Sequence, residues 1–189
     1  MFEFESHGGM KDMMAMETEL LGFLGFGNEY HRIKYDLACD MYGVDELDYA
    51  EEEALCKDNG DCTFLTHFPH RTHPFWNMKQ NDDDKNLYNK VDIIMHGQET
   101  IGSAERATNV DEMRENFHTI SDGEYADLLY KHFTKERVEK ELEEYLSHDF
   151  FPRFGGGIGV TRMVRAMEMS GLMKWNIQLG IKIGENPSS

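Results

Sequence analysis

Hydrophobic and polar residues alternate at the start of the chain and then change to a helical period. Phe2 to Ser6 reads FEFES, an alternation of aromatic and acidic residues that predicts a half-buried strand. Gly8 and Gly9 predict a turn. Residues 10–26 then carry apolar side chains, many of them methionines, at helical spacing. They predict a helix that ends at the nearby glycines.

The next segments continue the helical pattern. Tyr30–Tyr42 predicts a second helix, with Ile33, Leu37 and Met41 on one face. The acidic residues 45–59 predict a third helix, which Asn59 and Gly60 close. No chemistry is assigned to that acidic stretch.

The central part of the chain predicts extended structure. Cys62–Phe68 is rich in β-branched and aromatic residues, stops at Pro69 and resumes over Phe75–Lys79. Residues 81–85 are polar and predict a hairpin tip. Lys90–Arg106 alternates again, with Gly97 as an interruption.

Three helices are predicted beyond residue 109, over Val110–Phe117, Gly123–His132 and Glu136–His148. A glycine-rich stretch then reads FGGGIGVTRMVRAM over Phe154–Met167. Its glycines suit a strand that passes close under a ligand and turns into a helix, since they lack a Cβ atom. Arg162 would stand in the first turn of that helix, beside the ligand.

Composition narrows the class of protein. At 189 residues the chain has the size of one domain. Its formal net charge of -17 disfavours unaided binding to RNA or DNA, because polyanions are bound mainly through lysine and arginine. No apolar run approaches the roughly 20 residues of a membrane helix, and no signal peptide is recognisable. A soluble, cytoplasmic protein is expected.

Two carboxylates and an arginine follow one another at equal spacing in the second extended region. Asp92 and Glu99 lie seven residues apart, and Arg106 follows seven residues later. With Gly97 and Gly102 allowing bends, the three side chains could converge on one cleft. Alternatively, both carboxylates are ordinary residues of a polar strand face, and Arg106 pairs with one of them. The histidines at 67, 70 and 73 lack the fixed spacing of a metal site.

These motifs together resemble a known family. GGGIGVTR resembles motif 3 of the class II aminoacyl-tRNA synthetases, most closely the aspartyl/asparaginyl branch. The resemblance implies an α+β fold with a mostly antiparallel sheet flanked by helices. It also implies that Arg162 lies against ATP, that Asp92 and Glu99 bind Mg²⁺ and ATP, and that Arg106 receives the carboxylate of the substrate.

The resemblance implies further contacts. Phe2 falls near the aromatic residue on which adenine stacks, and Gly157 and Gly159 belong to the ATP-binding stretch. Ser103 would accompany Arg106 at the substrate carboxylate. Glu105 departs from the small residues that are usual there, so it could change the charge of the pocket.

Part of the family pattern is missing from this sequence. Motif 1 and the arginine of motif 2 would precede Met1, so residues 1–184 would form the C-terminal part of one catalytic domain, with a frayed tail over 185–189. Three explanations stay open: a portion of a longer protein, a companion chain that supplies the other half, or a chain without catalysis. A homodimer or a complementing N-terminal half is expected as the partner, and weak nucleotide binding with slow turnover for the chain alone.

Within this branch the segments HPFWNMK, QETIGSAER and GGGIGVTR are most similar to those of archaeal-type asparagine synthetases. That similarity implies a ligase that uses ATP to activate aspartate and ammonia to accept the aspartyl group. The first alternative is a truncated aspartyl- or asparaginyl-tRNA synthetase core, although the acidic charge makes tRNA an unexpected partner. The second is a non-catalytic paralogue that binds a nucleotide or a partner.

Overall fold

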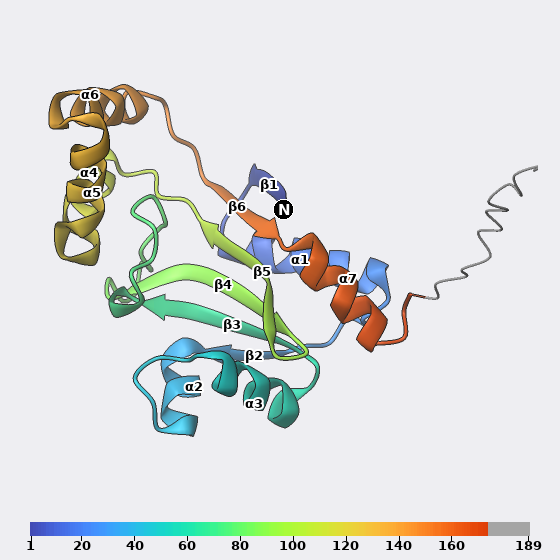
Figure 1. Cartoon of the computed structure of the whole chain (residues 1–189). Helices are drawn as coiled ribbons and strands as arrows, with labels where there is room; N and C mark the ends of the chain where they lie inside the picture. The colour runs from blue at the N-terminus through green and yellow to red at the C-terminus, as the bar shows by residue number, and fades with distance from the viewer. Residues whose placement is uncertain (174–189) are drawn as a thin grey trace, which may run out of the picture.

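A six-stranded sheet forms the centre of the molecule (Figure 1). The computed structural model describes residues 1–173. The strands are β1 (Phe2–His7), β2 (His31–Lys34), β3 (Cys62–Pro69), β4 (Leu87–Met95), β5 (Gln98–Glu105) and β6 (Arg153–Ile158). They lie in the order β1-β6-β5-β4-β3-β2, and only β2 and β3 run parallel. The predicted α+β class, a mostly antiparallel sheet flanked by helices, is confirmed.

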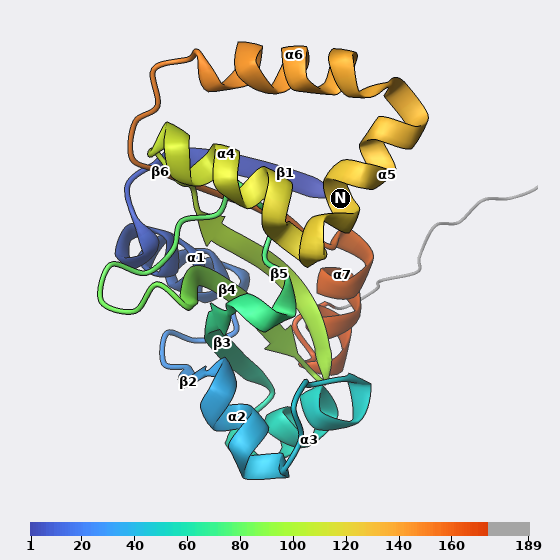
Figure 2. The same ribbon diagram turned by 90° about the vertical axis from the view of Figure 1, so that its left-hand side faces the viewer.

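Seven α-helices surround the described sheet. They are α1 (Met10–Leu24), α2 (Tyr35–Tyr42), α3 (Tyr49–Asn59), α4 (Val110–Thr119), α5 (Glu124–Phe133), α6 (Lys135–Leu146) and α7 (Val160–Met169), with short 3-10 turns at His70–Thr72 and Ile120–Gly123. Helices α1 and α7 pack on one face, whereas α2 and α3 cover the β2–β3 part of the opposite face. Helices α4, α5 and α6 form a separate group with its own core (Figure 2).

Alternation along the central strands separates the two faces. Val91 and Ile93 of β4 join the core beneath α1 and α7. Ile94 joins the core beneath α2 and α3, on the same face as Asp92. Since α2 and α3 stop short of β6 and β1, that second face stays open over the far half of the sheet.

The predicted helix over Tyr30–Tyr42 is wrong in its first half. Residues 31–34 form β2, because their backbone pairs in register with β3, Ile33 opposite Leu65. Helix α2 then buries Tyr35, Ala38 and Cys39, so Leu37 and Met41 are more than half exposed. Sequence periodicity reports only local structure, so it could not predict this long-range pairing.

Other differences are smaller. Residues 75–79 form a turn with one isolated bridge, from Met78 to Arg106, and no strand. Strand β1 exists as predicted, but it is the sheet edge and most of its residues are exposed. The predicted tail 185–189 lies outside the described residues. No helix within residues 1–173 is long and apolar enough to cross a bilayer.

Candidate active site

A cavity of about 680 Å³ lies on the open face of the sheet, across β4, β5, β6 and β1. Two rows of directly paired residues cross the strands there: Lys90, Ala104, Gly155 and Glu5 form the first, and Asp92, Gly102, Gly157 and Glu3 form the second. All eight line the cavity, which we call the trough. Its floor is therefore glycine and alanine, and its charged side chains stand at the two ends of each row.

The glycines of β6 allow this floor to be flat and close-packed. A Cβ atom on Gly155 would lie 2.5 Å from Glu5 Cγ and 3.0 Å from Arg106 Nη2. On the other face, a Cβ atom on Gly156 would lie 2.6 Å from Ser103 Cβ. Larger residues would displace the neighbouring strands or the ionic side chains. The predicted strand that turns into a helix is confirmed as β6 and α7.

Asp92 and Glu99 converge at the second row, as their spacing allows and the family resemblance implies. A Cβ atom on Gly102 would lie 2.6 Å from Glu99 Oε1 and 3.4 Å from Asp92 Oδ1, so both carboxylates face the same point. Burial raises the pKa of Asp92 to about 6; Lys90 opposes this rise and Glu99 adds to it. Asp92 Oδ1 is buried and has no hydrogen-bond partner within residues 1–173. This oxygen is suited to a cation or a donor that a ligand brings.

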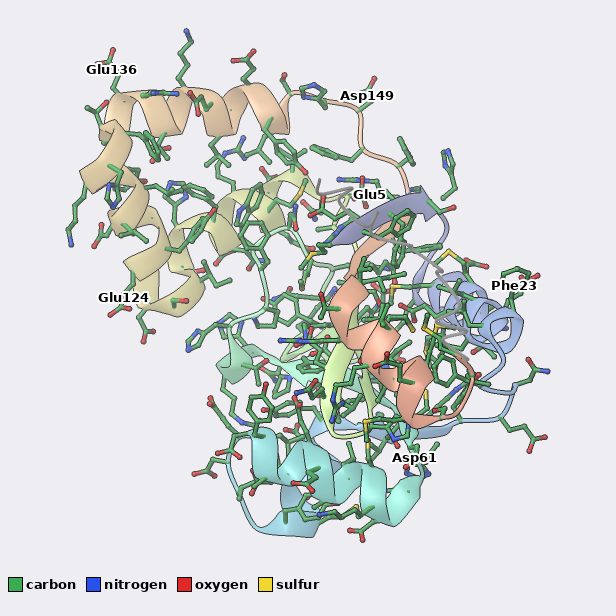
Figure 3. All side chains as sticks on the ribbon, turned by 45° about the vertical axis from the view of Figure 1, so that its right-hand side comes forward. Glu5, Phe23, Asp61, Glu124, Glu136 and Asp149 are labelled. Atoms are coloured by element: carbon green, nitrogen blue, oxygen red, sulfur yellow. The ribbon has the colours of Figure 1, made fainter. Side chains whose placement is uncertain are left out.

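Two cations face the same trough. Lys90 forms an ion pair with Asp92 Oδ2, and Arg106 Nε donates to Glu5 Oε1 at 3.2 Å. Glu5 projects from β1 (Figure 3). Arginine carries five N–H donors, and Glu5 is the one acceptor of Arg106 within the described residues. Its terminal nitrogens are thus available to a substrate carboxylate.

Arg162 stands beside the acidic pair. It lies in the first turn of α7, and its Nη1 donates to the carbonyl oxygen of Glu99 at 2.6 Å. Gly159 caps the same helix, and its N–H donates to the Thr100 carbonyl at 2.9 Å. The side chain of Arg162 therefore marks the end of the trough nearest the acidic pair, although neither Arg162 nor Gly159 lines the trough itself.

Two of the predicted site residues point to the opposite face of the sheet. Phe2 does not line the trough, because strand alternation places it on the face of Phe4, which packs against the core beneath α1 and α7. Ser103 borders the trough, but its side chain faces Glu17 of α1 and its hydroxyl donates to the Val91 carbonyl at 3.3 Å. In both cases strand alternation turns the side chain to the opposite face.

Glu105 does not change the charge of the trough. Its carboxylate accepts hydrogen bonds from the Met10 backbone at 3.1 Å, from Lys79 Nζ at 3.0 Å and from Asn89 Nδ2 at 2.8 Å. These partners hold Glu105 on the α1 side of the sheet. Glu105 itself does not line the trough, whereas Glu99, Gly102 and Ala104 of β5 do.

Sequence reasoning missed several residues of the site. Glu52 of α3 accepts a hydrogen bond from the Glu99 backbone at 3.4 Å, and burial, with Glu99 and Asp92 nearby, raises its pKa to about 7. No sequence signal places α3 against β5. Lys90, Glu3 and Glu5 were also missed, although their alternation with apolar neighbours predicts one shared face.

The described residues supply no complete metal site. Within residues 1–173, no group of three or more His, Cys, Asp or Glu side chains is arranged to hold an ion, and this includes the histidines at 67, 70 and 73. Asp92 and Glu99 alone offer two carboxylates. The oxygen without a partner on Asp92 fits a magnesium ion that arrives with phosphate oxygens of a nucleotide.

Comparison with known proteins identifies the family of this chain. Residues 5–174 match the family described as tRNA synthetases class II (D, K and N). This chain belongs to that family. No curated protein sequence matches this class II synthetase-family chain.

Solved structures show the same fold. Asparaginyl-tRNA synthetase from Pyrococcus horikoshii complexed with asparaginyl-adenylate has a TM-score of 0.68 at 20% identity, over 87% of this chain and 43% of its own. Aspartyl-tRNA synthetase from Entamoeba histolytica has a TM-score of 0.63 at 20% identity, over 87% and 39% respectively. Asparaginyl-tRNA synthetase from Entamoeba histolytica gives 0.64 at 19%, over 89% and 43%. This synthetase-family chain therefore spans less than half the length of these relatives.

Proposed function

We propose that this chain forms the amino-acid-binding part of an ATP-dependent ligase that activates aspartate as aspartyl-adenylate, with ammonia as the acceptor. The observation that carries the proposal is the convergence of Arg106, Asp92 and Glu99 on one glycine-floored trough. Membership in a family of adenylate-forming synthetases supports the same chemistry. The similarity of the motif sequences to those of archaeal-type asparagine synthetases supports ammonia as the acceptor.

The chemistry that the trough would support has two steps. An oxygen of the aspartate carboxylate attacks the α-phosphorus of ATP and pyrophosphate leaves. Ammonia then attacks the acyl carbon of the adenylate, loses a proton and releases AMP. Magnesium bound with the nucleotide would supply positive charge to the phosphate oxygens.

The residues of this chain act by binding and neutralisation. Arg106 offers its terminal nitrogens to the carboxylate of the substrate as a planar fork, a geometry that lysine cannot copy. Arg162 would neutralise phosphate charge near Glu99, whose carbonyl oxygen accepts a hydrogen bond from its Nη1. Asp92 and Glu99 would hold the magnesium ion. None of these roles requires this chain to transfer a proton.

The description of the family favours tRNA as an alternative acceptor. The structural relatives are tRNA synthetases, so the alternative is a core that activates aspartate or asparagine for transfer to tRNA. A third candidate is a paralogue without catalysis.

Nucleotide titration tests the first part of the proposal. ATP is added to the wild type and to Arg162→Ala, with and without Mg²⁺, and the heat of binding is recorded. We expect the wild type to bind ATP·Mg²⁺ about 10-fold more tightly than the variant, because a charged hydrogen-bonding contact is lost. Equal heats for the two proteins would contradict the role of Arg162.

Product analysis tests the acceptor. The chain is incubated with aspartate, ATP, Mg²⁺ and ammonium, with and without total tRNA, and asparagine and charged tRNA are measured separately. Asparagine is expected, at a rate that Arg106→Lys lowers about 10-fold or more. Charged tRNA in place of asparagine would establish the second candidate. ATP binding without either product, also after addition of a separately expressed N-terminal half, would favour the third.

A further inference from the structure

Lys90 is a cation of the trough to which the family resemblance assigns no role. It lies on β4 at one end of the first row, and its side chain is one-fifth exposed. Its directly paired neighbour, Ala104, contributes only a methyl group to the floor. The space beside the Lys90 ammonium is therefore left to a ligand.

The ammonium is held in place on the protein side. Asp92 pairs with it from two residues along the same strand, and Nζ lies 3.6 Å from the centroid of the Phe68 ring. A lysine ammonium has three N–H donors, and Asp92 is its one hydrogen-bond acceptor within residues 1–173. Lys90 is thus fixed in position while two of its donors stay available.

Lys90 also stands at the inner end of the site. A second cavity of about 370 Å³, lined in part by Phe68, Phe75 and Leu65, shares Lys90, Asp92 and Met78 with the trough. Lys90 therefore borders both cavities. A ligand that reaches from the trough toward the second cavity would meet this ammonium.

Arg106 is the second cation of the trough. Lys90 pairs with Ala104, the last β4–β5 pair at this end of the strands, and Arg106 follows Ala104 by two residues and bridges to Met78. Lys90 and Arg106 both line the trough, and each has N–H donors without a partner within the described residues. Two cations that line one trough suit a small ligand with two anionic groups.

We propose that Lys90 and Arg106 together select an amino acid with two carboxylates, each cation binding one of them, so that aspartate is preferred over asparagine. The inference rests on the proposed function and names the residue that fixes its substrate class. An amide in place of the second carboxylate loses the charge-assisted hydrogen bond to Lys90. The amide oxygen of asparagine carries only a partial negative charge, whereas the second carboxylate of aspartate carries a full one. The interaction with Lys90 therefore favours aspartate over asparagine.

Calorimetric titration of the full chain with aspartate and with asparagine, without nucleotide, tests this proposal. The wild type should bind aspartate about 10-fold more tightly than asparagine, the lower end of what a hydrogen bond to a charged group contributes. Lys90→Gln should lower aspartate affinity about 10-fold and change asparagine affinity by less than about 3-fold. Lys85→Gln, the same change at an exposed position of the hairpin before β4, should leave both affinities unchanged.

A second variant guards against misfolding. Lys90→Gln leaves Asp92 without its counter-ion, so the double variant Lys90→Gln/Asp92→Asn removes both charges and should show the same loss of selectivity. Preference for aspartate that persists in either variant would overturn the role of Lys90. So would a wild type that binds asparagine as tightly as aspartate, or that binds neither.

ATP titration of the same proteins distinguishes failure of the proposed role of Lys90 from failure of the proposed ligase function. A wild type that binds ATP but shows no preference for aspartate refutes the role of Lys90 alone. A wild type that prefers aspartate but does not bind ATP refutes the ligase function and leaves the role of Lys90 standing.

Discussion

Glu17 is the residue whose environment departs most from expectation. It lies in the middle of α1, is fully buried, and neither carboxylate oxygen has a hydrogen-bond partner within the described residues. Burial raises its pKa from 4.5 to about 7; the nearby Ser103 opposes the rise and Asp92, across the sheet, adds to it. Folding therefore favours the protonated form of Glu17.

This burial predicts a pH-dependent stability. The contribution of Glu17 is fully present below pH 4.5 and is lost as the pH rises through about 7, because the unfolded chain ionises first. Glu17→Met should raise the free energy of unfolding by up to about 3 kcal/mol at pH 8, and by much less at pH 5.

Urea unfolding at the two pH values measures the effect. Glu19→Met, the same change at an exposed position of α1, is the control. If Glu17→Met changes the stability equally at pH 5 and pH 8, the carboxyl group of Glu17 is not neutral in the folded protein.

Strand β6 is the element on which the trough depends. It pairs with β1 on one side and β5 on the other, and its three glycines adopt ordinary extended backbone angles. They are required because of contacts, since a Cβ atom on Gly156 would lie 2.6 Å from Ser103 Cβ and 2.7 Å from the Gly102 carbonyl oxygen.

Gly156→Ala should therefore destabilise the protein. The added methyl group meets the backbone of β5, which cannot move without breaking the sheet, and overpacking of this kind costs about 1–3 kcal/mol. Thermal unfolding followed by circular dichroism checks this. In Gly159→Ala the new atom meets Arg162 Cδ at an ordinary 3.4 Å, so the melting temperature should fall less. Equal melting temperatures for the two variants would mean that β6 can accommodate a methyl group at position 156.

The whole molecule carries a strong negative charge. Its 36 acidic residues exceed its 19 basic residues, and the helices that extend furthest from the sheet, α5 and α6, present Glu124 and Glu136 outward (Figure 3). Binding of tRNA depends on neutralisation of phosphates by lysine and arginine. This charge distribution offers little to a polyanion.

We therefore predict no salt-sensitive affinity for tRNA. Filter binding to total tRNA at low and at moderate salt tests this prediction. A tight complex whose affinity falls steeply with salt would instead support the tRNA synthetase alternative. The cytoplasmic location stays a prediction.

The sequence by itself determined the local features of this protein. Asp92, Glu99 and Arg106 lie on or directly after the two strands of one hairpin, so their spacing allowed them to converge and the family motif predicted that they would. The three helices of residues 110–146 were also predictable, because Val138, Leu142 and Leu146 follow a helical period and are buried as expected.

Tertiary structure decided everything that joins distant segments. Residues 31–34 became a strand because β3 offered a partner backbone. Glu52 reached Glu99 because α3 packs against β5, and Phe2 turned from the site because its register with β6 fixed its face. The trough itself is assembled from strands at both ends of the described chain. Its shape depends on cross-strand register, which local periodicity does not encode.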